Sequence, residues 1–503
     1  MEESEKNVKI SYAKNLNQYN FNTIVTIPID SNVTIKNILN IDSYLYDYSV
    51  ECVNGKAILK GKLSTEVVYV DTDGITNKVF ETQNFTETYS DSAITSETFI
   101  NIENHSVSSN ILSSDSTLKI SCDIHLTPVA YMNLGVPNST TSNEMMICKR
   151  KEIQTNTISN FINTQFEHVS VIETKEEISK VLCNTSNICV TNVEAEDGYA
   201  VVEGKINHCV VIEYLENDTA VIKEIKHSES FKHDIEIAEL KKGTILDLSF
   251  AINKTGDDIT TEIENNSSFI NIKNRIKVCG VAIKPISVDV IDDMYSIENE
   301  IETTISQRDY SKNVESFNIT ETIANELTLG AEETAIDEII ANLNTCAEIT
   351  NTYIKDGTIH IEGIVSSTLI CIDENKDYKN KFIELPFVIN TKIPAVSLGC
   401  TNSQISILDC RTKVKRGTII EIEYTVFAHI STHTKETHQV VDNFTIGKAI
   451  NFGNYDYQIF IAKQGESLWD LAKRIKISTE NLMQYNKNLP LVMEGGEKVI
   501  IKR

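Results

Sequence analysis

One construction occurs three times along this chain: a strand pattern that starts at a glycine and carries a second glycine six positions later. In the first copy, residues 55–69, alternate positions are apolar or small and the others are mostly polar, which is the period of a half-buried β-strand. The glycine pairs are Gly55 and Gly61, Gly198 and Gly204, and Gly357 and Gly363. The first glycine of each pair is expected to close a turn. The second lies on the inward face, where a missing side chain predicts a bulge, a bend or a close backbone approach.

The flanks of this strand repeat as well. About twenty residues before each turn glycine stands an apolar triplet with i, i+3, i+4 spacing, which predicts one short amphipathic helix per copy. The triplets are Ile35, Ile38 and Leu39; Ile178, Val181 and Leu182; and Ile336, Ile339 and Ile340. Downstream of the second glycine a phenylalanine recurs at a nearly fixed distance, as Phe85, Phe231 and Phe387. The chain therefore contains three homologous units of roughly 130 to 150 residues, a common domain size.

The expected fold is mainly β, with three tandem β-rich, sandwich-like domains that carry short helices, followed by a small α+β module. The predicted division is a polar N-terminal arm at 1–24, repeats at 25–150, 160–300 and 310–450, and the C-terminal module at 455–503.

Composition narrows the functional class. No apolar run approaches the roughly 20 residues that span a bilayer, so we expect no transmembrane segment. The acidic, polar N-terminus shows no secretory signal pattern, and the 11 scattered cysteines suit a reducing compartment. A net charge of −26 argues against a nucleic-acid binder. Residues 457–503 differ, because they hold 8 Lys and Arg against 5 Asp and Glu while the rest holds 38 against 67.

These last residues predict a strand, two helices and a second strand. The first helix begins near Ser467, with Asp470 spaced for a capping box. Its apolar residues Leu468, Leu471, Ala472 and Ile475 fall at i, i+3, i+4 and i+7. In the second helix Ser478 is the expected N-cap, and Leu482 and Tyr485 are expected to face inward.

This module resembles the LysM family in its strand, in Gly465 to Trp469, and in Ala472, Leu482, Asn486, Val492 and Gly495. The resemblance implies a shallow groove for N-acetylglucosamine polymers, with Gly465, Glu466, Ser467 and Leu468 on one side and Leu491, Val492 and Met493 on the other. Leu468 and Trp469 are expected at the core or its edge, whereas Glu466 and Ser467 are open between capping and contact. Glu494, Gly496 and Lys502 depart from the family's usual residues.

Three glycine-strand units ahead of a LysM module resemble SPOCS repeats and the clostridial spore-coat morphogenetic proteins of the SipL type. This resemblance implies a non-enzymatic scaffold, made in the mother-cell cytoplasm, which binds the coat-basement ATPase SpoIVA through its LysM domain and helps the spore coat encase the forespore. The alternative is a cell-wall protein that binds peptidoglycan or N-acetylglucosamine.

No catalytic or metal constellation emerges from the sequence. His429, His433 and His438 form the densest histidine group, but it begins in a strand pattern without the spacing of a zinc site. Phosphate-binding and dinucleotide-binding glycine loops and the serine-hydrolase motif are absent. We therefore predict no catalytic residues, no metal, no cofactor and no enzyme activity.

Overall fold

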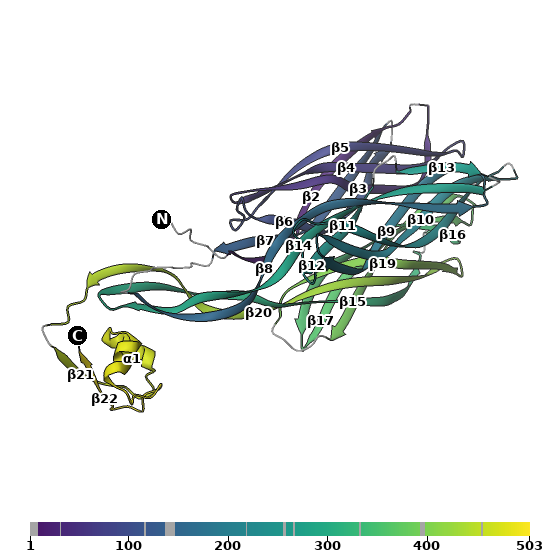
Figure 1. Ribbon diagram of the computed structural model, residues 1–503. Helices are drawn as coiled ribbons and strands as arrows, with labels where there is room; N and C mark the ends of the chain where they lie inside the picture. The colour runs from purple at the N-terminus through teal and green to yellow at the C-terminus, as the bar shows by residue number, and fades with distance from the viewer. Residues whose placement is uncertain are drawn as a thin grey trace.

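The computed structural model describes residues 9–502, except for residues 31, 115–116, 136–145, 218, 255–257, 265–266, 331–332, 393–397 and 454–455. The described chain is almost entirely antiparallel β-sheet, built as three two-layer sandwiches, a β stalk and a small C-terminal module (Figure 1). The expected mainly β architecture with tandem β-rich domains is therefore confirmed.

Each sandwich pairs a three-stranded sheet with a second sheet. In unit 1 the three-stranded sheet is β3 (Ile35–Val53), β4 (Lys56–Asp71) and β5 (Thr76–Ser90). Its partner sheet contains β1 (Lys9–Asn15), β2 (Tyr19–Pro28), β6 (Phe99–Ser114) and β7 (Thr117–Gly135). A continuous core of aliphatic and aromatic residues fills the space between them.

Units 2 and 3 repeat this plan. Unit 2 combines β9 (Ile178–Glu196), β10 (Tyr199–Glu216) and β11 (Thr219–Glu236) with β8 (Met146–Thr174), β12 (Ile245–Asn253), β13 (Ile259–Glu264) and β14 (Ser267–Ser296). Unit 3 combines β16 (Ile336–Lys355), β17 (Thr358–Asp373) and β18 (Tyr378–Lys392) with β15 (Asn299–Thr328), β19 (Leu398–Lys415) and β20 (Ile419–Ala449).

The prediction of a short helix before each glycine strand is wrong. The apolar triplets lie at the starts of β3, β9 and β16, where each strand carries two register shifts against its partner. In β3 the shifts fall between Ile35 and Asn37 and between Ile38 and Asn40. A bulge adds one residue to a strand, so two closely spaced bulges turn an alternating pattern into the i, i+3 spacing that resembles a helix.

The N-terminal arm expected at 1–24 is also different, because residues 9–15 form β1 and pair with residues 129–135 of β7. β7 extends beyond β2, and β1 completes the sheet there. Residues 151–159 and 301–309, which separate the predicted repeats, are strand within β8 and β15.

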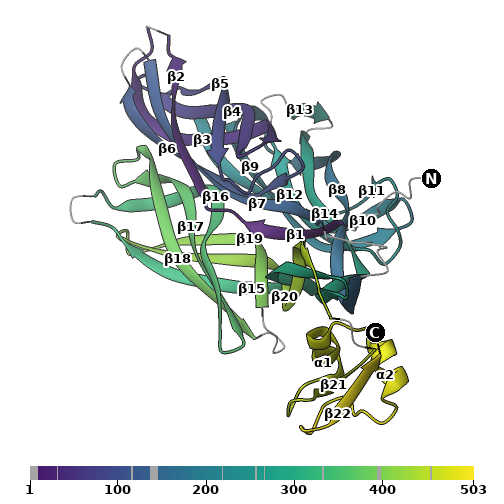
Figure 2. The same ribbon diagram turned by 90° about the vertical axis from the view of Figure 1, so that its left-hand side faces the viewer.

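The three units are grouped around one another, as Figure 2 shows end-on, and residues of all three pack into a common hydrophobic core. Val68, Val211 and Ile370 each stand seven positions after the second glycine of their unit, and all three are fully buried there. Leu39 and Leu182 join them from β3 and β9. Equivalent positions of the three units thus form one core, separate from the cores inside the sandwiches.

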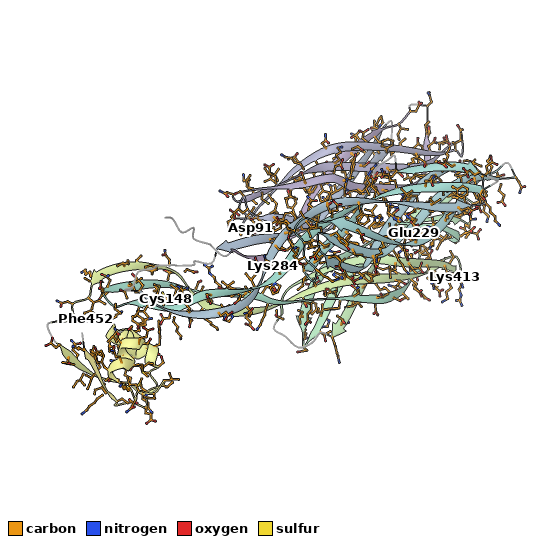
Figure 3. All side chains as sticks on the ribbon, viewed as in Figure 1. Asp91, Cys148, Glu229, Lys284, Lys413 and Phe452 are labelled. Atoms are coloured by element: carbon orange, nitrogen blue, oxygen red, sulfur yellow. The ribbon has the colours of Figure 1, made fainter. Side chains whose placement is uncertain are left out.

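A stalk of four strands extends from this body. The stalk ends of β8 and β14 pair with each other, as do those of β15 and β20, and the two ribbons share small apolar cores. Asn156 links them by donating from Nδ2 to the Lys312 carbonyl at 2.6 Å. In Figure 3, Cys148 lies along the stalk and Lys284 lies where it joins the body.

Candidate functional site

The C-terminal module forms as predicted. β21 (Tyr457–Ile461) pairs with β22 (Lys498–Lys502), and α1 (Leu468–Ile475) and α2 (Thr479–Tyr485) lie between them in the chain. Ser467 and Asp470 form the expected capping box, and Ser478 caps α2. Leu471, Ala472, Ile475 and Leu482 are buried. Tyr485 is the exception, since it is 44% exposed at the last residue of α2.

The two sides of the predicted groove are joined by backbone hydrogen bonds. Gly465 donates to the Met493 carbonyl at 2.9 Å, and Met493 donates to the Glu466 carbonyl at 2.8 Å. Leu468 donates to the Leu491 carbonyl, also at 2.9 Å. Gly465 has a φ of +77°, a left-handed conformation that favours glycine in this turn. The structure therefore brings the predicted residues together as two adjacent chain segments.

The side chains of these residues differ in what they offer a ligand. Leu491 and Val492 are 78% and 58% exposed, whereas Met493 is buried in the module's core. Leu468 is half-buried against that core, at the expected core edge. The accessible rim of the groove is thus formed mainly by Leu491 and Val492.

Glu466 and Ser467 hold the turn and the helix start. The Glu466 carboxylate accepts from Arg474 at 2.6 Å and 2.8 Å and from the Lys463 backbone N–H at 3.0 Å. Its hydrogen bond with Arg474 lowers the pKa of Glu466 below its usual value, against the effect of burial. Ser467 Oγ accepts from the Asp470 backbone N–H at 3.1 Å. Both side chains are therefore engaged within the module.

Trp469, the chain's single tryptophan, joins the module to the stalk. Its Nε1 donates to Asp293 Oδ2 at 2.7 Å, and Lys473 Nζ lies 2.6 Å from Asp293 Oδ1. The Tyr295 ring meets the Trp469 ring edge-on at 5.1 Å, and the Tyr295 hydroxyl donates to the Ile477 carbonyl at 2.7 Å. We call this contact the joint.

A β-bulge in β14 directs the side chain of Asp293 toward the module. The register of β14 against β8 shifts between Ile291 and Asp293, close to the end of the strand. Partial burial opposes ionisation of Asp293, yet the hydrogen bonds from Lys473 and Trp469 hold its pKa below the usual range. Sequence reasoning missed Asp293 and Tyr295, because nothing local marks a residue that contacts a module about 180 positions away.

The outer face of the β21–β22 sheet is a second exposed surface. Four large apolar side chains there are between 44% and 66% exposed, namely Tyr457, Ile459, Ile461 and Ile500. Lys498 and Lys502 lie on the same face. The alternation in these two short strands was the available sequence signal for this surface.

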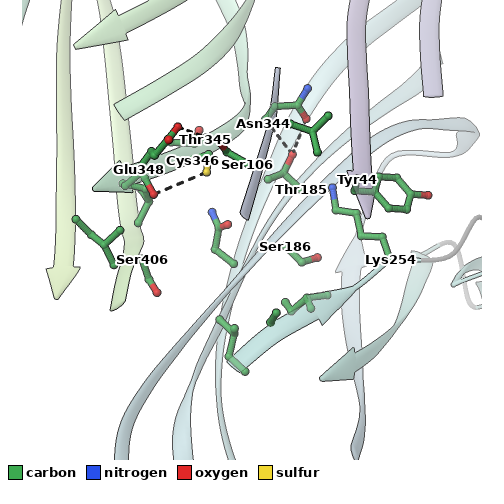
Figure 4. A pocket seen from close by; sticks show the side chains of 18 of the residues that line it. Tyr44, Ser106, Thr185, Ser186, Lys254, Asn344, Thr345, Cys346, Glu348 and Ser406 are labelled. Atoms are coloured by element: carbon green, nitrogen blue, oxygen red, sulfur yellow. Dashed lines mark hydrogen bonds between the residues drawn. The ribbon is translucent and has the colours of Figure 1, made fainter. Parts of the chain in front are cut away.

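A cavity of about 290 Å³ lies where the three units meet (Figure 4). Its charged groups are paired across the units: Lys254 Nζ lies 2.8 Å from Asp42 Oδ2, and Ser106 Oγ donates to Glu348 Oε2 at 2.9 Å. These contacts join units 2 and 1 and units 1 and 3. The cavity wall thus serves as an inter-unit seam.

Among the described residues, no group of three His, Cys, Asp or Glu side chains is arranged to hold a metal ion. His429 and His438 lie on β20, where His429 Nδ1 is 2.7 Å from Asn318 Oδ1. The side chain of His433 lies outside the described residues. Within the residues that the structure describes, no helix is long and apolar enough to cross a membrane.

Comparison with known families decides the nature of the C-terminal module, since residues 461–490 match the LysM domain family. This chain carries a LysM domain. No curated protein and no solved structure matches the chain. LysM domains bind carbohydrate such as peptidoglycan, or protein, so this module is the candidate binding site.

Proposed function

We propose that this chain is a non-enzymatic scaffold of spore-coat assembly, located at the forespore surface in the mother-cell cytoplasm, whose LysM domain docks the coat-basement ATPase SpoIVA. The observation that carries the proposal is the position of the LysM domain at the tip of the stalk (Figure 1). Its groove rim exposes the apolar side chains of Leu491 and Val492. The order of three repeat units followed by LysM, which resembles SPOCS-containing coat proteins, supplies the biological setting.

The chemistry of the groove favours a protein ligand over a glycan. Its accessible rim is aliphatic at Leu491 and Val492, while Glu466 is bound by Arg474 and Trp469 is engaged in the joint. Protein interfaces are centred on desolvated apolar side chains. A sugar ligand would also call on polar side chains to bind its hydroxyl groups, and those of Glu466 and Ser467 are already engaged within the module.

Binding to peptidoglycan or N-acetylglucosamine polymers is the second candidate. It is favoured by the family match and by the hydrogen-bonded pairing of the two groove segments, Gly465 with Met493 and Leu468 with Leu491. The two candidates differ in which ligand the intact chain binds.

Titration of the full-length chain with SpoIVA and, separately, with chitohexaose distinguishes them. The scaffold proposal expects binding to SpoIVA and none to the sugar. A doubly substituted chain, Leu491→Asp with Val492→Asp, should weaken SpoIVA binding at least tenfold, because two exposed apolar contacts are replaced by carboxylates. Sugar binding in the absence of SpoIVA binding would establish the cell-wall function instead.

The matched control is Ile263→Asp, at a side chain on β13 of the body that is 61% exposed. This change should leave SpoIVA binding at the wild-type value. Ile459→Asp, on the outer sheet face, tests the other apolar surface of the module: a loss there, with none at Leu491 and Val492, would move the docking site from the groove rim to the sheet.

A further inference from the structure

Among the described residues, unit 2 holds a connected group of four histidines, which we call the histidine chain. His168 on β8, His208 on β10, and His227 and His233 on β11 gather around Glu229, which also lies on β11. His208 is only 3% exposed. The positions equivalent to His208, each four residues after the second glycine, are Thr65 in unit 1 and Ser367 in unit 3.

Hydrogen-bond distances connect the members of this cluster. His168 Nδ1 lies 3.2 Å from His233 Nε2, and His168 Nε2 lies 3.0 Å from Glu229 Oε1. His208 Nε2 and Nδ1 each lie 2.8 Å from a serine hydroxyl, the first from Ser170 and the second from Ser186.

Ser170 closes the connection. Its hydroxyl donates a hydrogen bond to Glu229, and its oxygen accepts a hydrogen bond from Asn274 Nδ2 at 3.1 Å. Ser170 is fully buried and Asn274 is 1% exposed, so bulk water is excluded as an alternative partner at this point.

With Glu229 ionised, only one assignment of donors and acceptors satisfies these hydrogen bonds. An ionised Glu229 only accepts, so both the Ser170 hydroxyl and His168 Nε2 must donate to it. His168 Nδ1 is then an acceptor for the N–H of His233. Because the Ser170 hydroxyl donates its hydrogen to Glu229, the Ser170 oxygen accepts from His208 Nε2–H. His208 Nδ1 then carries no hydrogen and accepts from the Ser186 hydroxyl. Every bond is satisfied when His168 and His208 are neutral.

An added proton breaks this pattern. A protonated His208 would carry a charge in a buried site, and burial lowers its pKa to about 4. Burial, with His168, also lowers the pKa of His233. Burial opposes ionisation of Glu229, but hydrogen bonds from Ser170 and His168 hold its pKa below normal.

The titratable groups around the cluster come from β8 and β11, and the cavity that His208 and His227 line also holds Cys209 of β10, Lys226 of β11, and Asp409 and Cys410 of β19. His208 faces Glu229 and His227 on β11 and His168 on β8, and His233 also faces Asp234. β9 and β14 contribute the non-titrating side chains Ser186 and Asn274 to the hydrogen bonds.

The chain also bridges two sheets. β8 belongs to the sheet of β14, and β11 is the outer strand of the sheet of β9 and β10. His168 on β8 therefore connects to His233 and Glu229 across the open side of the sandwich. The rings of Phe166 and Phe231 pack there, with their centroids 5.9 Å apart. Figure 3 shows Glu229 within the body, far from the LysM domain.

We propose that this histidine chain is an acid-sensitive latch that fastens β8 to β11 at neutral pH and releases them on acidification. The folded pKa of His208 lies below the ordinary histidine value of about 6.5, so the closed form binds fewer protons than the open form. The latch is therefore strongest above about pH 6.5 and weakens as pH falls. One such histidine raises the opening constant about 15-fold between pH 6.5 and pH 5.

Hydrogen exchange of the full-length chain at pH 7.5 and pH 5.0, corrected for the intrinsic pH dependence of exchange, tests the latch. The opening constants of residues 165–174 and 227–234 should rise at least tenfold on acidification. The opening constants of β17 and β18 in unit 3 should rise much less. There Ser367 takes the place of the histidine and shares a hydrogen bond of 2.5 Å with the Tyr424 hydroxyl. Equal changes in both units would overturn the proposal.

Variants then assign the effect. His208→Ser, which installs the residue of unit 3, and His168→Asn should each flatten the pH dependence at β8 and β11. The control His360→Asn alters a histidine that stacks on Tyr353 in unit 3, and it should leave that dependence intact. A folded His208→Ser chain with the wild-type pH dependence would also refute the latch, and the wild-type comparison stands if a variant fails to fold.

Discussion

Two residue signals of the sequence turn out to be one contact. The recurring phenylalanines lie directly opposite the second glycines, as Gly61 with Phe85, Gly204 with Phe231 and Gly363 with Phe387. In each pair the aromatic ring covers the glycine so closely that a Cβ atom would lie 2.3 to 3.0 Å from ring carbons. The alternation predicted the inward glycine and the spacing predicted a repeated phenylalanine. Their pairing required the strand register, which the turn between the strands sets.

The three glycines should not respond equally to substitution. At Gly204 and Gly363 a new Cβ would also meet a backbone carbonyl, that of Cys189 at 2.4 Å or Glu348 at 2.3 Å, whereas at Gly61 the other neighbour is the Tyr48 side chain at 2.8 Å. A backbone carbonyl moves less readily than a side chain. We expect Gly204→Ala and Gly363→Ala to cost about 1–3 kcal/mol each, and Gly61→Ala to cost less.

Urea denaturation followed by circular dichroism would measure these costs. Lys205→Ala is the control, since Lys205 is the exposed neighbour of Gly204 on β10. Should all four variants unfold at the same urea concentration, the close approach would have no energetic consequence and our account of the repeated glycine–phenylalanine spacing would fail.

At the scale of elements, local sequence predicted the LysM domain well and the repeat strands only in part. The capping box, the N-caps and the inward face of α1 all depend on residues a few positions apart. The bulged starts of β3, β9 and β16 imitate a helical period, and only pairing with the neighbouring strand reveals them. The joint lies beyond both kinds of signal, because Trp469 and Asp293 are 176 positions apart.

The joint should be breakable without unfolding the LysM domain. Asp293→Ala removes the acceptor of both Trp469 and Lys473, at an expected cost of about 1–3 kcal/mol to the joint. The module's own core, including Leu471 and Leu482, is untouched. Because Trp469 is the single tryptophan, its emission should shift to the red and become more accessible to acrylamide quenching.

The neighbouring carboxylate provides a matched control. Asp292 pairs with Lys149 of the stalk at 3.5 Å and makes no contact with Trp469 among the described interactions. Asp292→Ala should leave the tryptophan spectrum at its wild-type position. An unchanged spectrum in Asp293→Ala would mean that the hydrogen bonds of Asp293 do not hold the LysM domain on the stalk.

At the scale of the whole molecule, the sequence predicted three repeats in a row but not their arrangement around one core. Val68, Val211 and Ile370 lie on the face of each glycine strand opposite to the one that the alternation placed inside. Apolar residues on both faces indicate a strand buried on both sides. The sequence could therefore have shown that the outer faces are covered, whereas only the structure shows that they cover one another.

This common core predicts that damage at the centre spreads among the units. Leu182→Ala, at a side chain that is 2% exposed and packs in the shared core, should cost about 2–5 kcal/mol. Ile206→Ala is the comparison, because Ile206 is fully buried within the sandwich of unit 2 alone. Both substitutions remove aliphatic volume from unit 2. They differ chiefly in whether the cavity forms in the shared core or in the core of unit 2.

Hydrogen exchange across the full-length chain would separate the two outcomes. With Leu182→Ala, protection should fall in β4 of unit 1 and β17 of unit 3 as well as in β10, since all three strands contribute to the shared core. With Ile206→Ala, the loss should be concentrated in unit 2. If Leu182→Ala affected unit 2 alone, the three sandwiches would be energetically independent despite their contact, and the division into repeats at 25–150, 160–300 and 310–450 would extend to their stability.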